Sequence, residues 1–417
     1  MATAPTTSLS QVTAMQRRTL IAAALGWLLD GFDVMLYALV ITSIVAEFGI
    51  TKATAGKIAT LTLLASGIGG VLFGWIADRI GRTKALMLSI LTYSVSSFAS
   101  GLATSIAMLA VCRFILGFGM GGEWNTGATL VAETWPTELR AKAISMVQST
   151  WALGYAAAAL VAGFFLRYVG GPNNWRWVFF VGVLPALVVL WIRKDVPESE
   201  MWLERKHGTA AAPQIKFSEI FSRPYIRTTL ALLFMNFFGM FAWWGLFTWI
   251  PSYLQLPVAK GGRGFDVALT TIMLVVLNLT GMFPGYGTFG WVADKIGRKK
   301  SCILYTLLAS LLVLLYARAT DPRMLLVLGT PVAFFATGFF SGSGIIGSEV
   351  FPTRIRARAL GFTYNGARTI SSIAPTVIGY VGQKYGLGSA FYLCAASLFL
   401  SMLSATQLPE TKGKILE

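Results

Sequence analysis

Long apolar stretches alternate with short polar segments along the whole of this 417-residue chain. Each stretch has at least about 17–20 residues, the length that a helix needs to cross the hydrocarbon core of a bilayer. The pattern predicts an all-α membrane protein with twelve transmembrane helices. They are expected near residues 19–42, 55–77, 84–103, 107–131, 142–166, 175–194, 227–251, 268–293, 300–317, 324–348, 360–382 and 387–408. The polar, Thr-rich start of the chain lacks a cleavage site, so we expect no removed signal peptide.

The chain repeats its own motifs at a fixed offset. GWIADRIGRTK at 74–84 returns as GWVADKIGRKK at 290–300, which lies 216 residues later. ETWPTELR at 133–140 returns as EVFPTRIR at 349–356, again 216 residues later. Motifs that recur in register indicate two homologous halves, and the parallel repeat of two six-helix bundles is typical of transporters.

The repeat divides the chain into five parts. They are a cytoplasmic tail (1–18), a six-helix bundle (19–194), a cytoplasmic linker (195–226), a second six-helix bundle (227–408) and a cytoplasmic tail (409–417). The linker is too short for a domain of its own, so we expect it to tether the two halves. Its first part, PESEMWLERK, could instead form a short amphipathic helix at the membrane surface.

Composition agrees with a membrane protein and removes one alternative. Charged residues make up 12% of the chain, against roughly 25% in soluble proteins. The net charge of +16 would suit a nucleic-acid-binding protein, but its distribution does not. With a cytoplasmic N-terminus, 23 of the 34 Lys and Arg fall in cytoplasmic segments, as the positive-inside rule requires. The basic clusters lack interleaved aromatic residues, so we expect them to face lipid and predict no nucleic-acid binding.

The residues that would support catalysis or a cofactor are missing from the sequence. The three cysteines, Cys112, Cys302 and Cys394, lie in predicted spans, and the single histidine, His207, lies in the linker. There is no zinc signature, no P-loop and no nucleophile elbow. We therefore expect no enzyme, no metal, no cofactor and no ATP-driven pump.

The repeated G-x-x-x-D-x-x-G-R-x-K and E-x-x-P-x-x-x-R motifs, followed in each half by PESE (197–200) or PETK (409–412), resemble the major facilitator superfamily over the whole chain. The segments LLDGFDVMLYAL (28–39), RFILGFGMGGEW (113–124) and ETWPTELRAKA (133–143), with WRWVFFVGVLP (175–185), are similar to the sialate:proton symporters and lactate permeases. They are nearly as similar to the aromatic-acid:proton symporters. The resemblance implies proton-coupled transport of small carboxylates across the bacterial inner membrane, by a monomer. Some sialate porters carry two extra spans in mid-chain, for which this linker has no room.

Charges that occur in both halves are expected to be architectural. By the resemblance, they form a network that latches the cytoplasmic side when the transporter faces outward. Ordinary positive-inside topology with incidental ion pairs is the alternative interpretation. The residues of this predicted gate are Asp78, Arg82, Glu133, Arg140, Asp294, Arg298, Glu349 and Arg356.

Other charges break the repeat, and they are the candidates for proton coupling. Of the eighteen acidic residues, only Asp30, Asp33 and Glu123 lie well inside a predicted span. Charges at this depth are costly and usually face a polar cavity or a partner. Asp30 and Asp33 share one helix face, so they should not both ionise readily. We predict proton coupling by these acids and Arg113, whose counterpart in the superfamily is often assigned to proton handling. The alternative is a structural role for each.

A third set of residues is predicted to bind the substrate. Arg368 lies about eight residues into its predicted span, and a guanidinium matches a carboxylate with two parallel hydrogen bonds. It could instead only neutralise Asp30 or Asp33. Polar and aromatic residues in the spans are further candidates for the lining of the site. They are Tyr37, Gln148, Trp151, Tyr155, Asn236, Trp243 or Trp244, Asn278, Tyr364 and Asn365.

The sequence thus predicts a secondary active transporter that moves a small organic anion with protons by alternating access. The anion is expected to be a monocarboxylate such as lactate, or an aromatic or heterocyclic carboxylate. A sialic-acid or sugar-acid symporter is the main alternative, and a membrane sensor that binds without transport is another.

Overall fold

Helices form the secondary structure of the described part of the chain, which comprises residues 12–171, 173–207 and 217–412 of this computed structural model. Local chemistry sets their ends. α1 (Ala14–Phe48) begins at a capping box of Thr13 and Gln16. It ends at Gly49, whose φ of 61° is a left-handed conformation that glycine adopts freely. The linker stretch GTAAAP, most of the predicted N-terminal tail and the last five residues lie outside the described residues.

The N-terminal half is built from α1 and five further spans, the last of which is two consecutive helices. These are α2 (Lys52–Ile80), α3 (Arg82–Gly101), α4 (Ile106–Thr134), α5 (Thr137–Tyr168), and α6 (Trp175–Val181) with α7 (Pro185–Asp195). The connecting segment contains α8 (Glu200–His207) and the 3₁₀ helix η2 (Phe217–Phe221). α8 lies where an amphipathic linker helix was expected, and Trp202 anchors it by donating to the Asp78 carbonyl at 2.9 Å.

The C-terminal half repeats this plan, but two of its spans are interrupted by π-helical turns. Its elements are α9 (Ile226–Gln255), η3 (Val258–Lys260), α10 (Val267–Val276), η4 (Leu277–Met282), α11 (Phe283–Ile296), α12 (Arg298–Arg318), α13 (Pro322–Val350), α14 (Thr353–Leu360), η5 (Gly361–Gly366), α15 (Ala367–Ser371), α16 (Ala374–Tyr385) and α17 (Leu387–Ala405). The π-helical turns are η4 and η5. The sequence predicted unbroken helices at both places. Turns of this kind are frequent at functional sites.

Ten helical stretches of the described chain are long and apolar enough to cross a membrane. Two more complete the predicted twelve. α3 is rich in Ser and Thr, and the run from α14 to α16 is divided among several short helices. The prediction of an all-α membrane protein with two six-span halves is confirmed.

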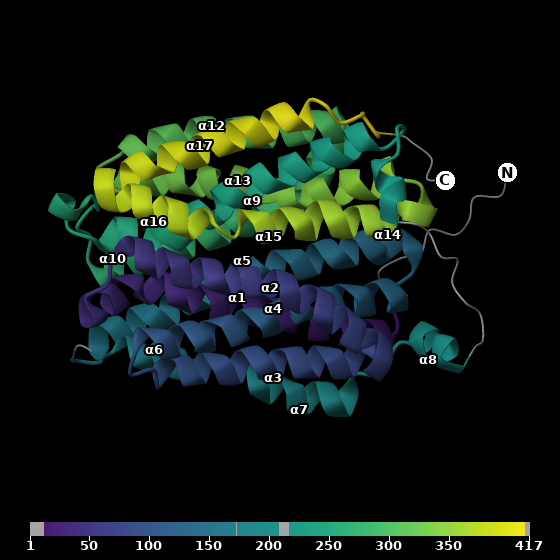
Figure 1. Cartoon of the computed structure of the whole chain (residues 1–417), viewed down its shortest axis with the longest axis horizontal. Coiled ribbons are helices and arrows are strands. Elements are labelled where there is room, and N and C mark those ends of the chain that lie inside the picture. The colour runs from purple at the N-terminus through teal and green to yellow at the C-terminus, as the bar shows by residue number, and fades with distance from the viewer. Residues whose placement is uncertain (1–11, 172, 208–216, 413–417) are drawn as a thin grey trace.

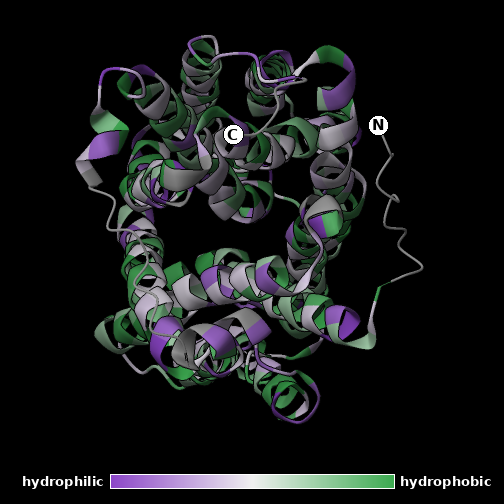
Figure 2. Cartoon of the chain, turned by 90° about the vertical axis from the view of Figure 1, so that its right-hand side faces the viewer, coloured by the Kyte–Doolittle hydropathy of each residue, from purple (hydrophilic) through white to green (hydrophobic). Residues whose placement is uncertain are grey.

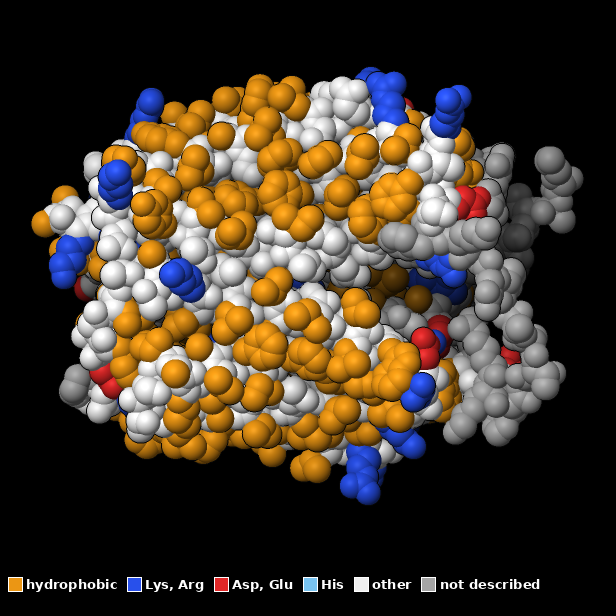
Figure 3. All heavy atoms as spheres, viewed as in Figure 1, with side chains coloured by type: hydrophobic (Ala, Val, Ile, Leu, Met, Phe, Trp, Pro, Cys, Tyr) orange, Lys and Arg blue, Asp and Glu red, His pale blue; other side chains and the backbone are white. Residues whose placement is uncertain are grey.

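The two halves lie side by side with their helices roughly parallel to one long axis (Figure 1). A view turned by 90° shows these helices nearly end-on, around a common centre (Figure 2). α8 and α14 lie at one end of the molecule, which is called the α8 end below, and the opposite end is called the far end. Hydrophobic side chains cover the middle of the surface in Figure 3, and Lys and Arg lie mostly towards the two ends. This distribution suits a protein surrounded by lipid.

The internal repeat is visible in how each half closes its helix ends. Glu198 accepts from the backbone N–H of Arg82 at 2.8 Å, and Glu410 accepts from that of Arg298 at 2.8 Å, so each carboxylate caps a helix N-terminus. Partial burial acts to raise the pKa of Glu410, but four backbone N–H donors outweigh it and hold the pKa below its usual value. The PESE and PETK motifs therefore have the same structural task.

At the far end, each half uses an arginine to cap the carbonyl groups at the end of a helix, but the two arginines come from different positions in the repeat. Arg176 donates to the carbonyls of Gly101 and Ala103, at 3.1 and 2.5 Å. Arg263 donates to those of Ala317 and Ala319, at 3.2 and 2.8 Å. The accepting residues are 216 apart, whereas the arginines are not, so the cap is preserved although its source differs.

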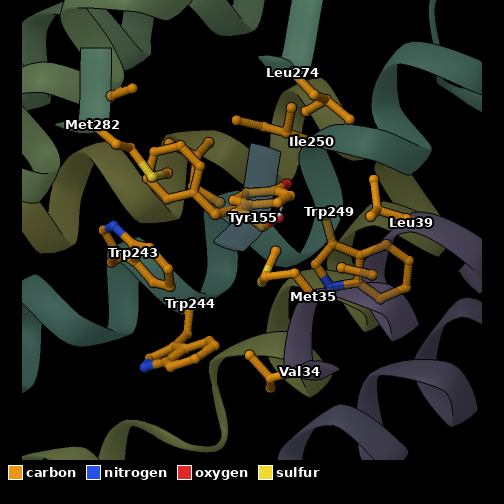
Figure 4. Packing of buried hydrophobic residues seen from close by; sticks show 14 of the residues in the cluster. Val34, Met35, Leu39, Tyr155, Trp243, Trp244, Trp249, Ile250, Leu274 and Met282 are labelled. Atoms are coloured by element: carbon orange, nitrogen blue, oxygen red, sulfur yellow. Dashed lines mark hydrogen bonds between the residues drawn. The ribbon is translucent and has the colours of Figure 1, made fainter. Parts of the chain in front are cut away.

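Buried side chains from both halves pack together in the centre. Met35 and Leu39 of α1 lie beside Trp249 of α9, and Tyr155 of α5 lies between the halves (Figure 4). The Tyr155 hydroxyl donates to the Phe247 carbonyl at 3.2 Å and so joins α5 to α9. This contact region continues towards the far end and supports the site described next.

Candidate functional site

Two groups of buried charges occupy the interior of the N-terminal half and its boundary with the C-terminal half. Asp30, Asp33 and Glu123 are each 1% exposed, and so is Arg113. Arg368, from the C-terminal half, is 6% exposed. All five lie in the part of the bilayer where an isolated charge is costly, so their arrangement is informative about function.

The first group consists of Asp30, Glu123 and Arg368. Asp30 and Glu123 interact electrostatically with each other and with Arg368, but none of the described ion pairs joins them. Glu123 reaches α1 one turn before Asp30, where a Cβ on Gly26 would collide with its Oε1 atom. Glycine at this position is what allows the carboxylate to approach. One atom on each of the three side chains (Asp30 Oδ2, Glu123 Oε2 and Arg368 Nη2) is buried without a hydrogen-bond partner.

The second group places Asp33 beside Arg113. The Arg113 guanidinium donates to the carbonyls of Asp33 and Val34, at 3.5 and 3.2 Å, and lies 5.3 Å from the centre of the Tyr37 ring. Asp33 accepts a hydrogen bond of 2.9 Å from the Ser97 hydroxyl. Asp30 and Asp33 therefore share a helix face as predicted, yet each has its own set of neighbours.

Tyr93 of α3 lies between the two groups and was not anticipated from the sequence. It is fully buried, its hydroxyl donates to the Gly26 carbonyl at 3.4 Å, and it interacts electrostatically with all three acids. Ser97 lies one helical turn further along the same helix. Nothing in the sequence singles out either residue, because α3 contains many Ser and Thr residues and they do not form one periodic polar face.

Around Arg368, the C-terminal half supplies amide and aromatic groups from interrupted helices. Tyr364 and Asn365 belong to the π-helical turn η5, immediately before Arg368. Asn236 of α9 donates to the Thr363 carbonyl in this turn at 3.2 Å and accepts from Ser343 at 2.5 Å. Asn236 thus holds the turn in place with one bond from each end of its amide.

Aromatic residues of both halves meet next to these groups. Trp151 of α5 has its ring 4.8 Å from Trp243 and 6.3 Å from Trp244, both of α9. Trp151 also packs on Gly31 of α1, where a Cβ would lie 3.0 Å from the indole ring. Figure 4 shows Trp243 and Trp244 on neighbouring faces of this region, with Tyr155 nearby. These predicted lining residues are brought together at the interface of the halves.

The remaining predicted lining residues are more scattered. Gln148 is 8% exposed and its side chain approaches the Tyr286 hydroxyl across the interface. Asn278 lies in the other π-helical turn, η4, and its Oδ1 atom is buried without a partner. Tyr37 donates to the Ala55 carbonyl at 2.9 Å and contacts Arg113, so the structure places it with the second charged group and not beside Arg368.

The predicted gate residues lie at the α8 end, in matching positions of the two halves. Arg82 pairs with Asp78 at 2.5 Å and with Glu133 at 3.1 Å. Arg298 pairs with Asp294 at 2.6 Å and with Glu349 at 3.3 Å. Arg140 and Arg356 donate instead to backbone carbonyls, those of Trp135 and Phe351. Each described ion pair of this set lies within one half.

Contacts between the halves are concentrated away from the α8 end. Lys52 donates to the carbonyls of Lys260 and Gly382, at 2.8 and 3.3 Å, and Thr60 bonds Thr376 at 2.7 Å. In the described part of the chain, the hydrogen bonds that join the halves all come from the middle or the far end. Figure 3 shows the surface hollowed between the halves at the α8 end. The molecule is therefore closed at the far end and open at the α8 end.

This architecture has clear relatives. The sequence profile of the Major Facilitator Superfamily matches residues 23–286 and 256–415. The chain is 34% identical over 406 residues to a protein of Cupriavidus pinatubonensis named as a probable 4-methylmuconolactone transporter, covering 96% of this chain and 92% of the relative. It is 34% identical over 415 residues to the sialic acid transporter NanX of Escherichia coli, covering 97% and 96%.

Among solved structures, the xylose transporter XylE of E. coli, in a partially occluded inward-open conformation, has a TM-score of 0.80 at 20% identity, over 97% of this chain and 100% of that one. The chain belongs to the Major Facilitator Superfamily. It is a multi-pass membrane protein and a secondary transporter of small organic substrates, not an enzyme.

Proposed function

We propose that the protein is a proton-coupled symporter of a small organic carboxylate, which binds to Arg368 at the interface of the halves. The observation that carries this proposal is the state of the Arg368 side chain. Its guanidinium is buried, permanently charged and outside any described ion pair, and its Nη2 atom has no partner. A buried guanidinium N–H without an acceptor is costly, and a carboxylate ligand supplies the missing acceptor together with a negative charge.

The aromatic residues that meet at the interface of the halves favour a small anion with a planar or apolar body. Trp151, Trp243 and Trp244 offer ring faces and edges, whereas a sugar needs many polar partners for its hydroxyl groups. A monocarboxylate or an aromatic or heterocyclic carboxylate therefore fits better. A sugar acid is the second candidate substrate, because one relative is named as a sialic acid transporter. The carboxylate of a sugar acid would bind Arg368 in the same way.

The buried acids supply the coupling to protons. Asp30 and Glu123 interact electrostatically with Arg368, so a substrate carboxylate at Arg368 competes with them for the same cation. An acid that loses its cation in a poorly hydrated site is stabilised by taking up a proton. Asp33 and Arg113 form a second element of the proton coupling, and their described contacts lie within the N-terminal half.

Alternating access follows from the duplicated halves. The α8 end carries the basic gate clusters, so we assign it to the cytoplasm by the positive-inside rule, with both termini cytoplasmic and the protein in the bacterial inner membrane. The state described above is then the inward-facing one. The gate pairs around Arg82 and Arg298 would rearrange when this end closes. Each chain contains a complete site, so a monomer suffices for transport.

Calorimetry on the detergent-purified protein tests the anchor, with lactate, benzoate, nicotinate and N-acetylneuraminate as ligands. Loss of a charge-assisted hydrogen bond is worth about 1.5–3 kcal/mol, so Arg368→Ala should weaken binding about 10- to 150-fold. Arg368→Lys should give an intermediate affinity, because it keeps the charge but not the two-pronged geometry. Arg167→Ala is the control, since Arg167 is exposed in α5 far from the site.

Two results would contradict the role of Arg368. Near-normal affinity in Arg368→Ala would remove it from the binding site. Restoration of binding by adding Asp30→Asn to Arg368→Ala would mean that Arg368 only neutralises the acid.

A further inference from the structure

The group of charges at the interface of the halves has two acidic side chains and one basic side chain, so it has one possible negative charge too many. Asp30 and Glu123 both interact with Arg368, while Asp33 has Arg113 as its own cation. Asp33 and Arg113 are therefore balanced. The remaining group has one more acid than it has cations.

Phenol groups face this group of charges from both halves. Tyr93 of α3 faces both acids with a phenol, and Tyr364 of η5 faces Arg368 with another. Phenols are neutral near pH 7. Asp33 also interacts with Asp30, and a negative charge on it disfavours a second ionised carboxylate there. With Glu123 and Asp30 each 1% exposed, water does not stabilise an extra negative charge either.

A buried group of this kind is stable only when its charges balance. Without substrate, balance with Arg368 requires one acid to be ionised and the other to hold a proton. With a monocarboxylate bound to Arg368, the substrate supplies the negative charge, so balance requires both acids to be protonated. The difference between the two states is one proton.

We propose that Asp30 and Glu123 share a single proton opposite Arg368, and that binding of a monocarboxylate adds one proton to the pair. This inference rests on the proposed function, because it needs the anion at Arg368. In the loading step, the substrate carboxylate takes the guanidinium, and the ionised acid forms an O–H bond with a proton from the aqueous side. Release reverses the step. One negative and one positive charge move together, so transport of a monocarboxylate is electroneutral.

Sharing also predicts how single substitutions behave. In Glu123→Gln, Asp30 is ionised opposite Arg368 without substrate and protonated with substrate, so one proton is still taken up. Asp30→Asn leaves Glu123 to do the same. Only the double variant, Asp30→Asn with Glu123→Gln, has no acid left to protonate, and its binding of the anion should not depend on pH near neutrality.

The test is proton uptake on binding, obtained by calorimetry of the purified protein near pH 7 in buffers of different ionisation enthalpy. Nicotinate is the probe, with benzoate as a second monocarboxylate. The expected uptake is one proton per anion for the wild type and for each single variant, and none for the double variant.

Uptake of two protons or of none by the wild type would overturn the inference, and so would loss of uptake in either single variant. The wild-type value decides the matter even if a variant fails to fold. These outcomes differ from failure of the proposed function, in which the wild type would bind no carboxylate or Arg368→Ala would bind as well as the wild type.

Discussion

Arg113 and Arg368 are both buried guanidinium groups inside spans, but they are held in different ways. Arg113 donates to two backbone carbonyls of α1 and lies between the Tyr37 and Phe179 rings, 5.3 and 5.5 Å from their centres. Arg368 follows a π-helical turn of the other half, and its Nη2 atom is buried without a hydrogen-bond partner, as is the Nε atom of Arg113. The difference is one of place: Arg113 is held within one half, whereas Arg368 lies opposite the acids of the other half, where we propose that a ligand binds.

This contrast leads to a prediction for Asp33, the acid beside Arg113. Asp33→Asn removes the negative charge but leaves the buried Arg113 guanidinium, and a buried charge that loses its counter-charge destabilises a protein by up to about 3–5 kcal/mol. The melting temperature in detergent should fall clearly. Adding Arg113→Gln should recover part of the loss, because the unpaired charge is then gone as well. Ser97→Ala is a milder comparison, since it removes only one hydrogen bond to Asp33. An unchanged melting temperature in Asp33→Asn would show that the two side chains do not stabilise each other.

The buried charges could be predicted from the sequence, because a charged residue in an apolar stretch is conspicuous. Their division into one group at Arg368 and another at Arg113 could not be predicted. Asp30 and Asp33 are neighbours along α1, but Glu123 approaches this helix at Gly26, one turn before Asp30, and so it is grouped with Asp30. Tyr93 and Ser97 escaped notice, since hydroxyl groups in a span are common and only the packing of α3 against α1 gives them acids as neighbours.

At the scale of elements, close contact between α2 and α16 closes the far end. A Cβ at Gly56 would collide with the Pro375 carbonyl oxygen, and one at Gly379 would lie 2.7 Å from the Lys52 carbonyl oxygen. The two helices can approach this closely only because both positions are glycine. Hydropathy predicted these spans well, but it could not predict the π-helical turns η4 and η5. Both interruptions lie within apolar runs whose composition is compatible with a regular helix.

The helix contact gives a direct prediction. Gly56→Ala should force α2 and α16 apart and shift the protein towards states that are open at the far end. Gly74→Ala in the same helix is the matched control, because a Cβ there meets nothing within 4 Å. Spin labels at the exposed residues Leu102 and Val258, one in each half, report the opening as a longer distance. An equal distance distribution in the two alanine variants would refute the role of this contact.

The whole molecule combines an open α8 end and a closed far end with a buried group of charges between them, which we propose responds to both substrate and protons. The six-plus-six architecture could be predicted from the sequence because the motifs repeat 216 residues apart. The state of the gates could not, since both states use the same residues and differ only in which contacts are made.

Uptake into proteoliposomes shows whether a proton gradient drives the accumulation of a carboxylate through the site at Arg368. The ligand bound most tightly in calorimetry is supplied in radiolabelled form, with the outside acidic. We expect accumulation above equilibrium in wild-type vesicles and its collapse with a protonophore. Arg368→Ala vesicles should accumulate no more than protein-free liposomes. Accumulation that survives the protonophore, or wild-type uptake no greater than that of protein-free liposomes, would contradict this expectation.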